Sequence, residues 1–192
     1  MPSRLIGLFV EDFAQEQFIG ALTRKLIEAQ GFDPIIRSYV SRGGRPAVLS
    51  ELRGFFQLQA HAAEKPDYIV VGNDGNCQGL NARRAEVERY IPDSWKHRVI
   101  LAIPDPHIEA WFLRDLPAFH RAVGPCGAPP QQKCSKGVYK EVLKKSTNDA
   151  VGVAPLDGIE NAQAIVFEQD VGVLLTSGAD LRNFIGEVRA IV

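Results

Sequence analysis

The sequence predicts an α/β fold with a mainly parallel sheet flanked by helices. Three short apolar segments, at residues 5–10, 67–72 and 99–103, have the composition of strands buried on both faces. Segments of helical periodicity alternate with them, which is typical of strand–helix–strand units. The length of 192 residues fits a single domain. We expect residues 1–123 to form the α/β core and residues 124–192 to add a loop and a small helical C-terminal extension packed on it.

The first strand, at residues 5–10, is followed by a helix at residues 14–30, because Phe18, Leu22 and Leu26 recur at helical spacing before Gly31. The core then continues with strands at residues 34–39, 67–72 and 99–103, and with helices at residues 48–63, 80–90 and 108–114. In the last third, helical periodicity is present at residues 138–145, 158–170 and 181–192. Residues 173–175 are too few to assign.

The charge and hydropathy patterns exclude several classes of protein. Lys and Arg number 22 and Asp and Glu number 23, so the net charge of −1 excludes a strongly basic nucleic-acid coat. A metal-bridged or locally basic contact remains compatible with this balance. The apolar N-terminal segment is shorter than a signal peptide requires, and no segment approaches the ~20 apolar residues of a membrane span. We therefore expect a soluble, cytoplasmic protein with no membrane contact.

The three cysteines, Cys77, Cys126 and Cys134, are odd in number and lack C-x-x-C spacing. Free thiols in a reducing compartment are the simplest interpretation. A zinc site on Cys126 and Cys134 is less favoured, because the loop that holds them has no obvious histidine partner.

Acidic residues follow each of the three apolar strands. Glu11, Asp74 and Asp105 come after residues 5–10, 67–72 and 99–103, respectively. The carboxyl ends of parallel strands share one edge, where open α/β sheets bind their ligands. Taken singly, each carboxylate also fits a solvated loop or a helix cap. Taken together, they predict a metal site at this edge.

Two of these loops contain further candidate side chains. Asp74 and Asn76 place oxygen atoms at positions i and i+2 of a turn, where both can bind one hard cation. A plain turn in which Asn76 and Gly75 adopt positive φ angles is an equal alternative. His107 and Glu109 follow Asp105 at the same edge. His107 can bind a metal or relay a proton, and Glu109 can act as a general base, but both also fit ordinary roles at a helix start.

Basic residues form a fourth set, either a solvated face or a track for phosphate groups. The candidate phosphate contacts are Arg42, Arg45, Arg83, Arg84 and Lys136. Lys133 and Lys140 are candidates for neutralising negative charge that develops on a phosphate during reaction.

Two of the motifs resemble those of Toprim domains. Residues 9–18, FVEDFAQEQF, resemble the first Toprim motif, in which a glutamate follows the first strand, and residues 74–79, DGNCQG, are similar to the D-x-D motif. The segment IEAWFLRD, residues 108–115, resembles the E-A-W segment of small bacterial Toprim-like proteins, which are related to the overcoming-lysogenization-defect nucleases. The resemblance covers residues 5–115. The matched acidic positions are Glu11 and Asp74, whereas Asn76, Asp12 and Gln15 depart from the family pattern.

This resemblance implies a Toprim-like fold and Mg²⁺- or Mn²⁺-dependent hydrolysis of phosphodiester bonds, with DNA favoured over RNA as the substrate. It implies metal binding by Glu11 and Asp74, assisted by Asn76 and Asp105, and a place in a bacterial anti-phage defence complex beside an ATPase, with oligomers allowed.

Two alternatives to this function remain open. The first is a catalytically degenerate binding or regulatory module, and the second is an enzyme that transfers phosphate on a small nucleotide.

Overall fold

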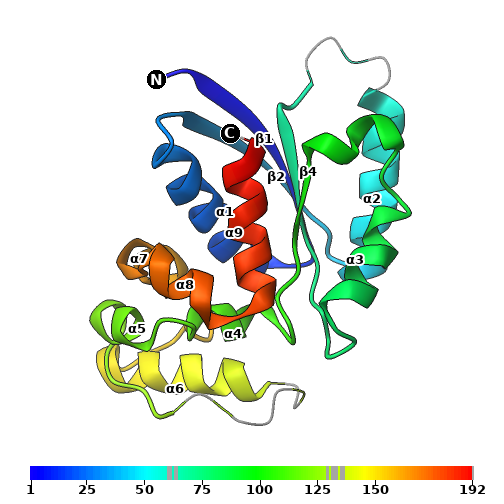
Figure 1. Ribbon diagram of the computed structural model, residues 1–192. Coiled ribbons are helices and arrows are strands. Elements are labelled where there is room, and N and C mark those ends of the chain that lie inside the picture. The colour runs from blue at the N-terminus through cyan, green and yellow to red at the C-terminus, as the bar shows by residue number, and fades with distance from the viewer. Residues whose placement is uncertain (60–61, 63–64, 129, 131–133, 135–136, 192) are drawn as a thin grey trace.

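The computed structural model describes residues 1–59, 62, 65–128, 130, 134 and 137–191. Four parallel strands form one sheet in the order β2-β1-β3-β4 (Figure 1). They are β1 (Ser3–Val10), β2 (Asp33–Val40), β3 (Tyr68–Gly72) and β4 (Val99–Ala102). The predicted α/β class and mainly parallel sheet are confirmed.

Helices cover both faces of the sheet. One face carries α1 (Phe13–Glu28) and α9 (Ala179–Ile191), and the other carries α2 (Gly44–Gln59) and α3 (Leu80–Glu88) (Figure 1). The remaining helices are η1 (Asp93–Arg98), α4 (Ile108–Phe112), α5 (Leu116–Ala122), α6 (Val138–Val151), η2 (Ile159–Asn161), α7 (Ala162–Glu168) and α8 (Val171–Ser177). Of these, α4 to α8 lie below the sheet in the view of Figure 1, on the side of α1 and α9.

The strands β1, β3 and β4 are largely buried on both faces because their side chains alternate between two apolar clusters, whereas most of the edge strand β2 is not buried. Along β1, Ile6, Leu8 and Val10 join the cluster under α1 and α9, whereas Phe9 joins the cluster under α2 and α3. Side chains in a strand point to opposite faces in turn, so a strand between two helix layers must be apolar at every position. This is why these three strands are continuous apolar segments in the sequence.

The sequence placed the core elements within a few residues but misjudged the extension. The helix at residues 116–122 was not predicted, and α6 runs six residues further than expected, to a left-handed Gly152 with φ of 82°. Residues 158–170 divide into η2 and α7, and residues 173–175 belong to α8. The second predicted helix begins earlier, at Gly44, and part of its expected end lies outside the described residues.

The expectation of three free thiols is wrong. Cys77 and Cys134 form a disulfide with their Cα atoms 5.8 Å apart, and Cys126 is a free, half-buried cysteine. The bond joins the loop after β3 to the segment before α6, which are 57 residues apart in the sequence. Disulfides persist mainly in oxidising compartments, so this bond does not support the cytoplasmic expectation, which stays a prediction. Within the described ranges, no helix is long and apolar enough to cross a bilayer.

Candidate active site

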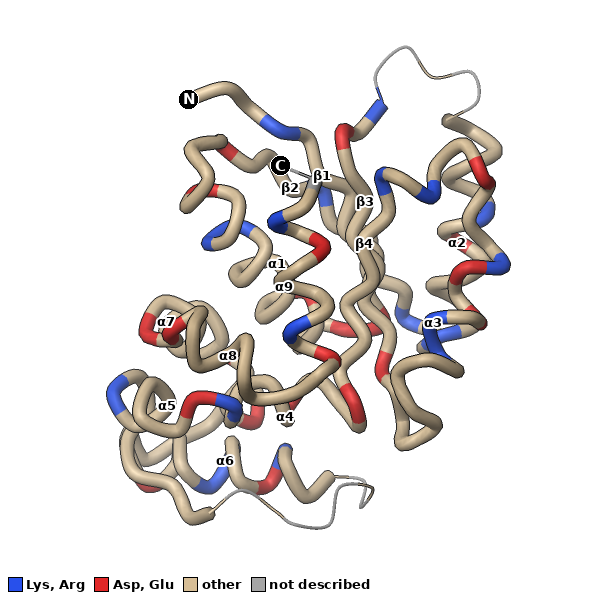
Figure 2. The backbone as a smooth tube through the Cα atoms, in the orientation of Figure 1, with Lys and Arg blue, Asp and Glu red and all other residues tan. Residues whose placement is uncertain are grey.

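The carboxyl ends of β1 and β3 lie side by side where the chain connections diverge. From β1, the chain crosses to β2 on one side, whereas β3 pairs with β1 on the other. Such a topological switch point is where α/β sheets bind ligands. Figure 2 shows acidic positions close to the lower ends of the strands.

Glu11 and Asp74 meet at this point. Glu11 directly follows β1, and Asp74 stands two residues after the end of β3. The backbone N–H of Asp74 donates a hydrogen bond of 3.0 Å to Glu11 Oε1, although the two residues are 63 positions apart. The sheet therefore brings together two of the three acidic residues that the sequence predicts at this edge.

Gln15 connects the same two residues from the first turn of α1. Its Nε2 donates to Asp74 Oδ1 at 2.9 Å, and its Oε1 accepts from the backbone N–H of Glu11 at 3.0 Å. The side chain is fully buried. Sequence reasoning treated Gln15 only as a departure from a family pattern and missed this role. The signal was present, because Gln15 is a polar residue on the apolar face of α1, four positions before the buried Ile19.

The loop after β4 supplies the third side of the site. His107 Nδ1 lies 3.3 Å from Asp74 Oδ2, and the backbone N–H of Ile108 donates to Asp74 Oδ1 at 3.2 Å. Asp105 turns toward the loop after β3 and accepts a 3.1 Å hydrogen bond from the backbone N–H of Cys77 on its Oδ1. The peptide bond between Asp105 and Pro106 is cis.

Gly75 allows the two loops to approach closely. A Cβ at this position would lie 2.7 Å from Asp105 Oδ1, a distance that real Cβ contacts do not reach. The backbone N–H of Gly75 donates to the carbonyl of Pro104 at 2.7 Å, and that of Asn76 donates to the carbonyl of Pro106 at 2.8 Å. Asn76 itself is exposed with φ of 49°, and its side-chain amide donates to the carbonyl of Asp74 at 3.3 Å.

The carboxylates of the site are held in surroundings that disfavour their charge. Burial raises the pKa of Glu11, and the neighbouring Asp74 carboxylate raises it further. Burial also raises the pKa of Glu109, to which Asp74 and Asp12 add. The hydrogen bond to Asp74 raises the pKa of His107, but the pKa of Asp74 is also raised, because its burial outweighs the effect of the imidazolium. Carboxylates with raised pKa values in one cleft are typical of functional sites.

The donor chemistry of this edge fits a divalent cation. Repulsion among the carboxylates would be relieved by a cation, and Mg²⁺ is commonly bound through one or two carboxylates while it keeps several waters. Glu11 Oε2 has no hydrogen-bond partner among the described residues and lies beside a cavity of about 670 Å³, which Asp12, Glu16 and Arg42 also line. The described residues do not contain a group of three or more His, Cys, Asp or Glu side chains arranged as metal ligands.

Several of the basic candidates already have partners. Arg83 is fully buried; its Nε donates to the carbonyl of Asp74 at 2.9 Å, and it forms an ion pair with Glu86. Because Arg83 is buried, it cannot contact a phosphate as predicted. Its hydrogen bond to Asp74 instead stabilises the loop after β3. Arg45 Nε also pairs with Glu86, at 3.3 Å.

Of the other basic candidates, Arg84 and Lys140 are paired with carboxylates, whereas Arg42 lies beside Glu11. Arg84 pairs with Glu88 at 3.3 Å and with Glu187 of α9, and Lys140 Nζ lies 3.0 Å from Asp157 Oδ2 within the extension. Arg42 is exposed and lines the cavity beside Glu11. Lys133 and Lys136 lie outside the described residues.

Comparisons of the chain with protein-family models, with curated proteins and with solved structures found no match.

Proposed function

We propose that this chain is a metal-dependent nuclease that hydrolyses phosphodiester bonds of DNA or RNA at the carboxyl edge of its sheet. The observation that carries the proposal is the direct hydrogen bond between Asp74 and Glu11 at the switch point between β1 and β3. These two residues also match the acidic positions of the Toprim motifs.

In this proposal, Glu11 and Asp74 hold Mg²⁺ or Mn²⁺, and Asn76 and Asp105 assist. The ion supplies Lewis acidity to the scissile phosphate when it is bound. Gln15 and Arg83 keep the loop that carries Asp74 in place through the hydrogen bonds described above.

Glu109 and His107 are the candidates for proton transfer. Burial raises the pKa of Glu109 toward neutral pH, which suits a general base that accepts a proton from the attacking water. The pKa of His107 is also raised, by its hydrogen bond to Asp74, so this residue is better suited to hold a proton beside the site.

Cleavage assays on plasmid and on labelled oligonucleotides with Mg²⁺ and Mn²⁺ test the proposal. We expect Glu11→Gln and Asp74→Asn to lower the cleavage rate by at least about 100-fold, because a catalytic metal contributes several kcal/mol to transition-state stabilisation. Glu141→Gln and Asp149→Asn are matched controls, since both residues are exposed on α6. Equal cleavage by all four variants and the wild type would refute the proposal.

A regulatory module that has lost catalysis is the second candidate. It is favoured by Asn76 in place of an acidic residue and by the finding that the described part of the chain lacks a set of three metal-ligating side chains. Calorimetric titration with Mn²⁺ discriminates between the two, because a catalytic site should bind the ion in the micromolar-to-millimolar range. A place beside an ATPase in anti-phage defence rests on the resemblance alone.

A further inference from the structure

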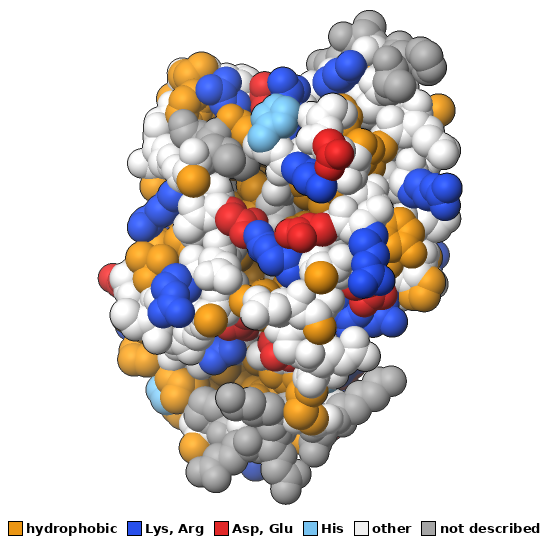
Figure 3. Space-filling view, turned by 45° about the vertical axis from the view of Figure 1, so that its right-hand side comes forward, with side chains coloured by type: hydrophobic (Ala, Val, Ile, Leu, Met, Phe, Trp, Pro, Cys, Tyr) orange, Lys and Arg blue, Asp and Glu red, His pale blue; other side chains and the backbone are white. Residues whose placement is uncertain are grey.

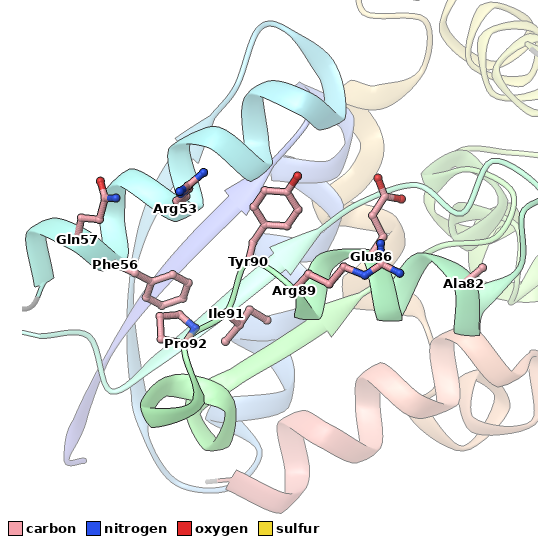
Figure 4. A pocket seen from close by; sticks show the side chains of 9 residues that line it. All are labelled: Arg53, Phe56, Gln57, Ala82, Glu86, Arg89, Tyr90, Ile91 and Pro92. Atoms are coloured by element: carbon pink, nitrogen blue, oxygen red, sulfur yellow. The ribbon is translucent and has the colours of Figure 1, made fainter.

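A cavity separate from the one beside Glu11 is a groove between α2 and α3, on the face of the sheet opposite α1. Its volume is about 950 Å³, and Arg53, Phe56, Glu86, Arg89 and Tyr90 are among its lining residues. Arg53 and Phe56 come from α2, Glu86 and Arg89 come from α3 or its end, and Tyr90 lies between the two helices (Figure 4). None of these five residues belongs to the edge where Glu11 and Asp74 meet.

The groove carries positive charge that the rest of the protein does not neutralise. Glu86 is its only acidic lining residue among those described, and it is already paired with Arg83 and Arg45. Arg53 and Arg89 are exposed and have no carboxylate partner in the described part of the chain. Residues 42–59 and 80–92 together hold six arginines and three glutamates, although the whole chain has a net charge of −1.

This positive charge is local. Figure 3, in which the right-hand side of Figure 1 is turned toward the viewer, shows Lys and Arg side chains interspersed with acidic and hydrophobic ones. This face therefore carries no broad basic coat that would attract an anionic partner. The feature that would attract one is the pair of guanidinium groups of Arg53 and Arg89 in the groove, which have no carboxylate partner among the described residues.

The groove leads toward the candidate active site. Both α2 and α3 begin at the carboxyl edge of the sheet: a Cβ at Gly44 would lie 3.9 Å from Glu11 Oε2, and α3 follows the loop that carries Asp74. Glu86 connects the groove to this edge, because its partner Arg83 donates to the carbonyl of Asp74. Arg45 and then Arg42 continue the line of guanidinium groups to the cavity beside Glu11.

We propose that the groove between α2 and α3 binds a single strand of nucleic acid and directs it to the site at Glu11 and Asp74. Arg53 and Arg89 contact backbone phosphates, and a base stacks on Tyr90, whose side chain is 38% exposed beside Phe56. A volume of about 950 Å³ is that of a small-molecule site, which fits a few nucleotides of one strand better than a duplex. This inference rests on the proposed nuclease function and specifies how its substrate is held.

The test measures binding apart from catalysis. Fluorescence anisotropy of a labelled single-stranded 20-mer, as DNA and as RNA, is recorded in EDTA over a range of salt concentrations. We expect Arg53→Gln/Arg89→Gln to raise Kd at least about tenfold and to reduce the slope of log K against log salt by about 1.4, since each phosphate contact to a single strand contributes about 0.7. Arg182→Gln/Arg189→Gln, on the exposed side of α9, is the control with the same charge change.

Tyr90 supplies a second, independent measurement. Tyr90→Leu should raise Kd about tenfold without changing the salt slope, and Tyr90→Phe should bind as the wild type does, because stacking needs the ring and not the hydroxyl. The inference is overturned if the wild type fails to bind either strand, if the groove variants bind as the control does, or if duplex DNA binds more tightly than both single strands.

A small substrate separates this inference from the proposed function. Bis(p-nitrophenyl) phosphate needs no groove, so the groove variants should hydrolyse it at the wild-type rate while they lose oligonucleotide cleavage. If Glu11→Gln leaves hydrolysis of this diester unchanged, the nuclease proposal fails even where the groove binds strands. If oligonucleotide cleavage is equally fast in the groove variants and the wild type, the groove inference fails and the nuclease proposal stands.

Discussion

The backbone N–H of Asp105 donates a hydrogen bond of 3.1 Å to Oδ2 of Asp180, at the start of α9. The same carboxylate oxygen accepts from Trp111 Nε1 at 2.7 Å and lies 3.3 Å from Arg114. The C-terminal extension is thus bonded to the loop that carries Asp105 and His107. Trp111 of the E-A-W segment is one of the residues that make this connection.

Removal of the Asp180 carboxylate should destabilise the protein and displace this loop. Asp180→Ala leaves the buried indole N–H of Trp111 and the backbone N–H of Asp105 without an acceptor, which should cost about 2–4 kcal/mol in the free energy of unfolding. Asp180→Asn keeps an acceptor oxygen and should cost less than half as much. Urea denaturation of the two variants measures the difference, and equal stability of Asp180→Ala and the wild type would contradict it.

Substitution of Gln15 should weaken the site as well as the fold. Gln15→Leu removes the donor to Asp74 and the acceptor for the N–H of Glu11, so we expect a loss of about 1–3 kcal/mol in unfolding free energy and a loss of about 10-fold or more in Mn²⁺ affinity. Gln17→Leu is the control in the same helix, because its hydrogen bond to Gln163 is exposed. Unchanged Mn²⁺ affinity in a folded Gln15→Leu protein would show that Gln15 does not position the carboxylates.

Glu11→Gln should stabilise the metal-free protein while it lowers activity. The pKa of Glu11 is raised by burial and by Asp74, so its charge opposes folding at pH values above the raised pKa, and this opposition disappears as the pH falls through it. The neutral amide should therefore raise the free energy of unfolding by about 0.5–2 kcal/mol at pH 7.5. A gain of this size is typical when a destabilising charge is removed from a functional site. The gain should shrink toward acidic pH, and thermal unfolding at pH 7.5 and pH 5 measures it.

The pKa of His107 should lie above the ordinary histidine value of about 6.5, because its imidazolium is hydrogen-bonded to Asp74. A raised histidine pKa contributes stability that is complete below the unfolded pKa and is lost as pH rises through the folded value. NMR titration of the His107 ring measures the pKa directly. Asp74→Asn should bring it down toward 6.5, and an unaltered titration in that variant would exclude the pair as the cause.

A methyl group at Gly75 should separate the two loops of the site. Gly75→Ala places a Cβ against the Asp105 carboxylate, which should cost about 1–3 kcal/mol and lower activity. Gly54→Ala is the matched control, because nothing lies within 4 Å of a Cβ at this position in α2. This control should be neutral or more stable than the wild type by up to about 1 kcal/mol, since alanine favours a helix. Denaturation curves of the two variants give opposite signs if the close approach at Gly75 matters.

The sequence by itself determined the parallel sheet and the edge at which the site lies. Local periodicity decides whether a segment becomes a strand or a helix, and a strand buried on both faces has to be apolar along its whole length. The sequence therefore predicts that Glu11 and Asp74 lie at one edge, because the carboxyl ends of parallel strands lie together. The helix at residues 116–122 was missed because it is only seven residues long, too short for helical periodicity to be recognised.

Only the tertiary structure decided which side chains serve that edge. Gln15 joins the Asp74 carboxylate to the backbone N–H of Glu11, Arg83 is enclosed rather than exposed, and Asp180 contacts Asp105, 75 positions earlier in the chain. The pairing of Cys77 with Cys134 belongs to the same class. Each of these contacts joins residues whose separation in the sequence carries no periodic signal, so it depends on how the helices pack and on which buried polar group must find a partner there.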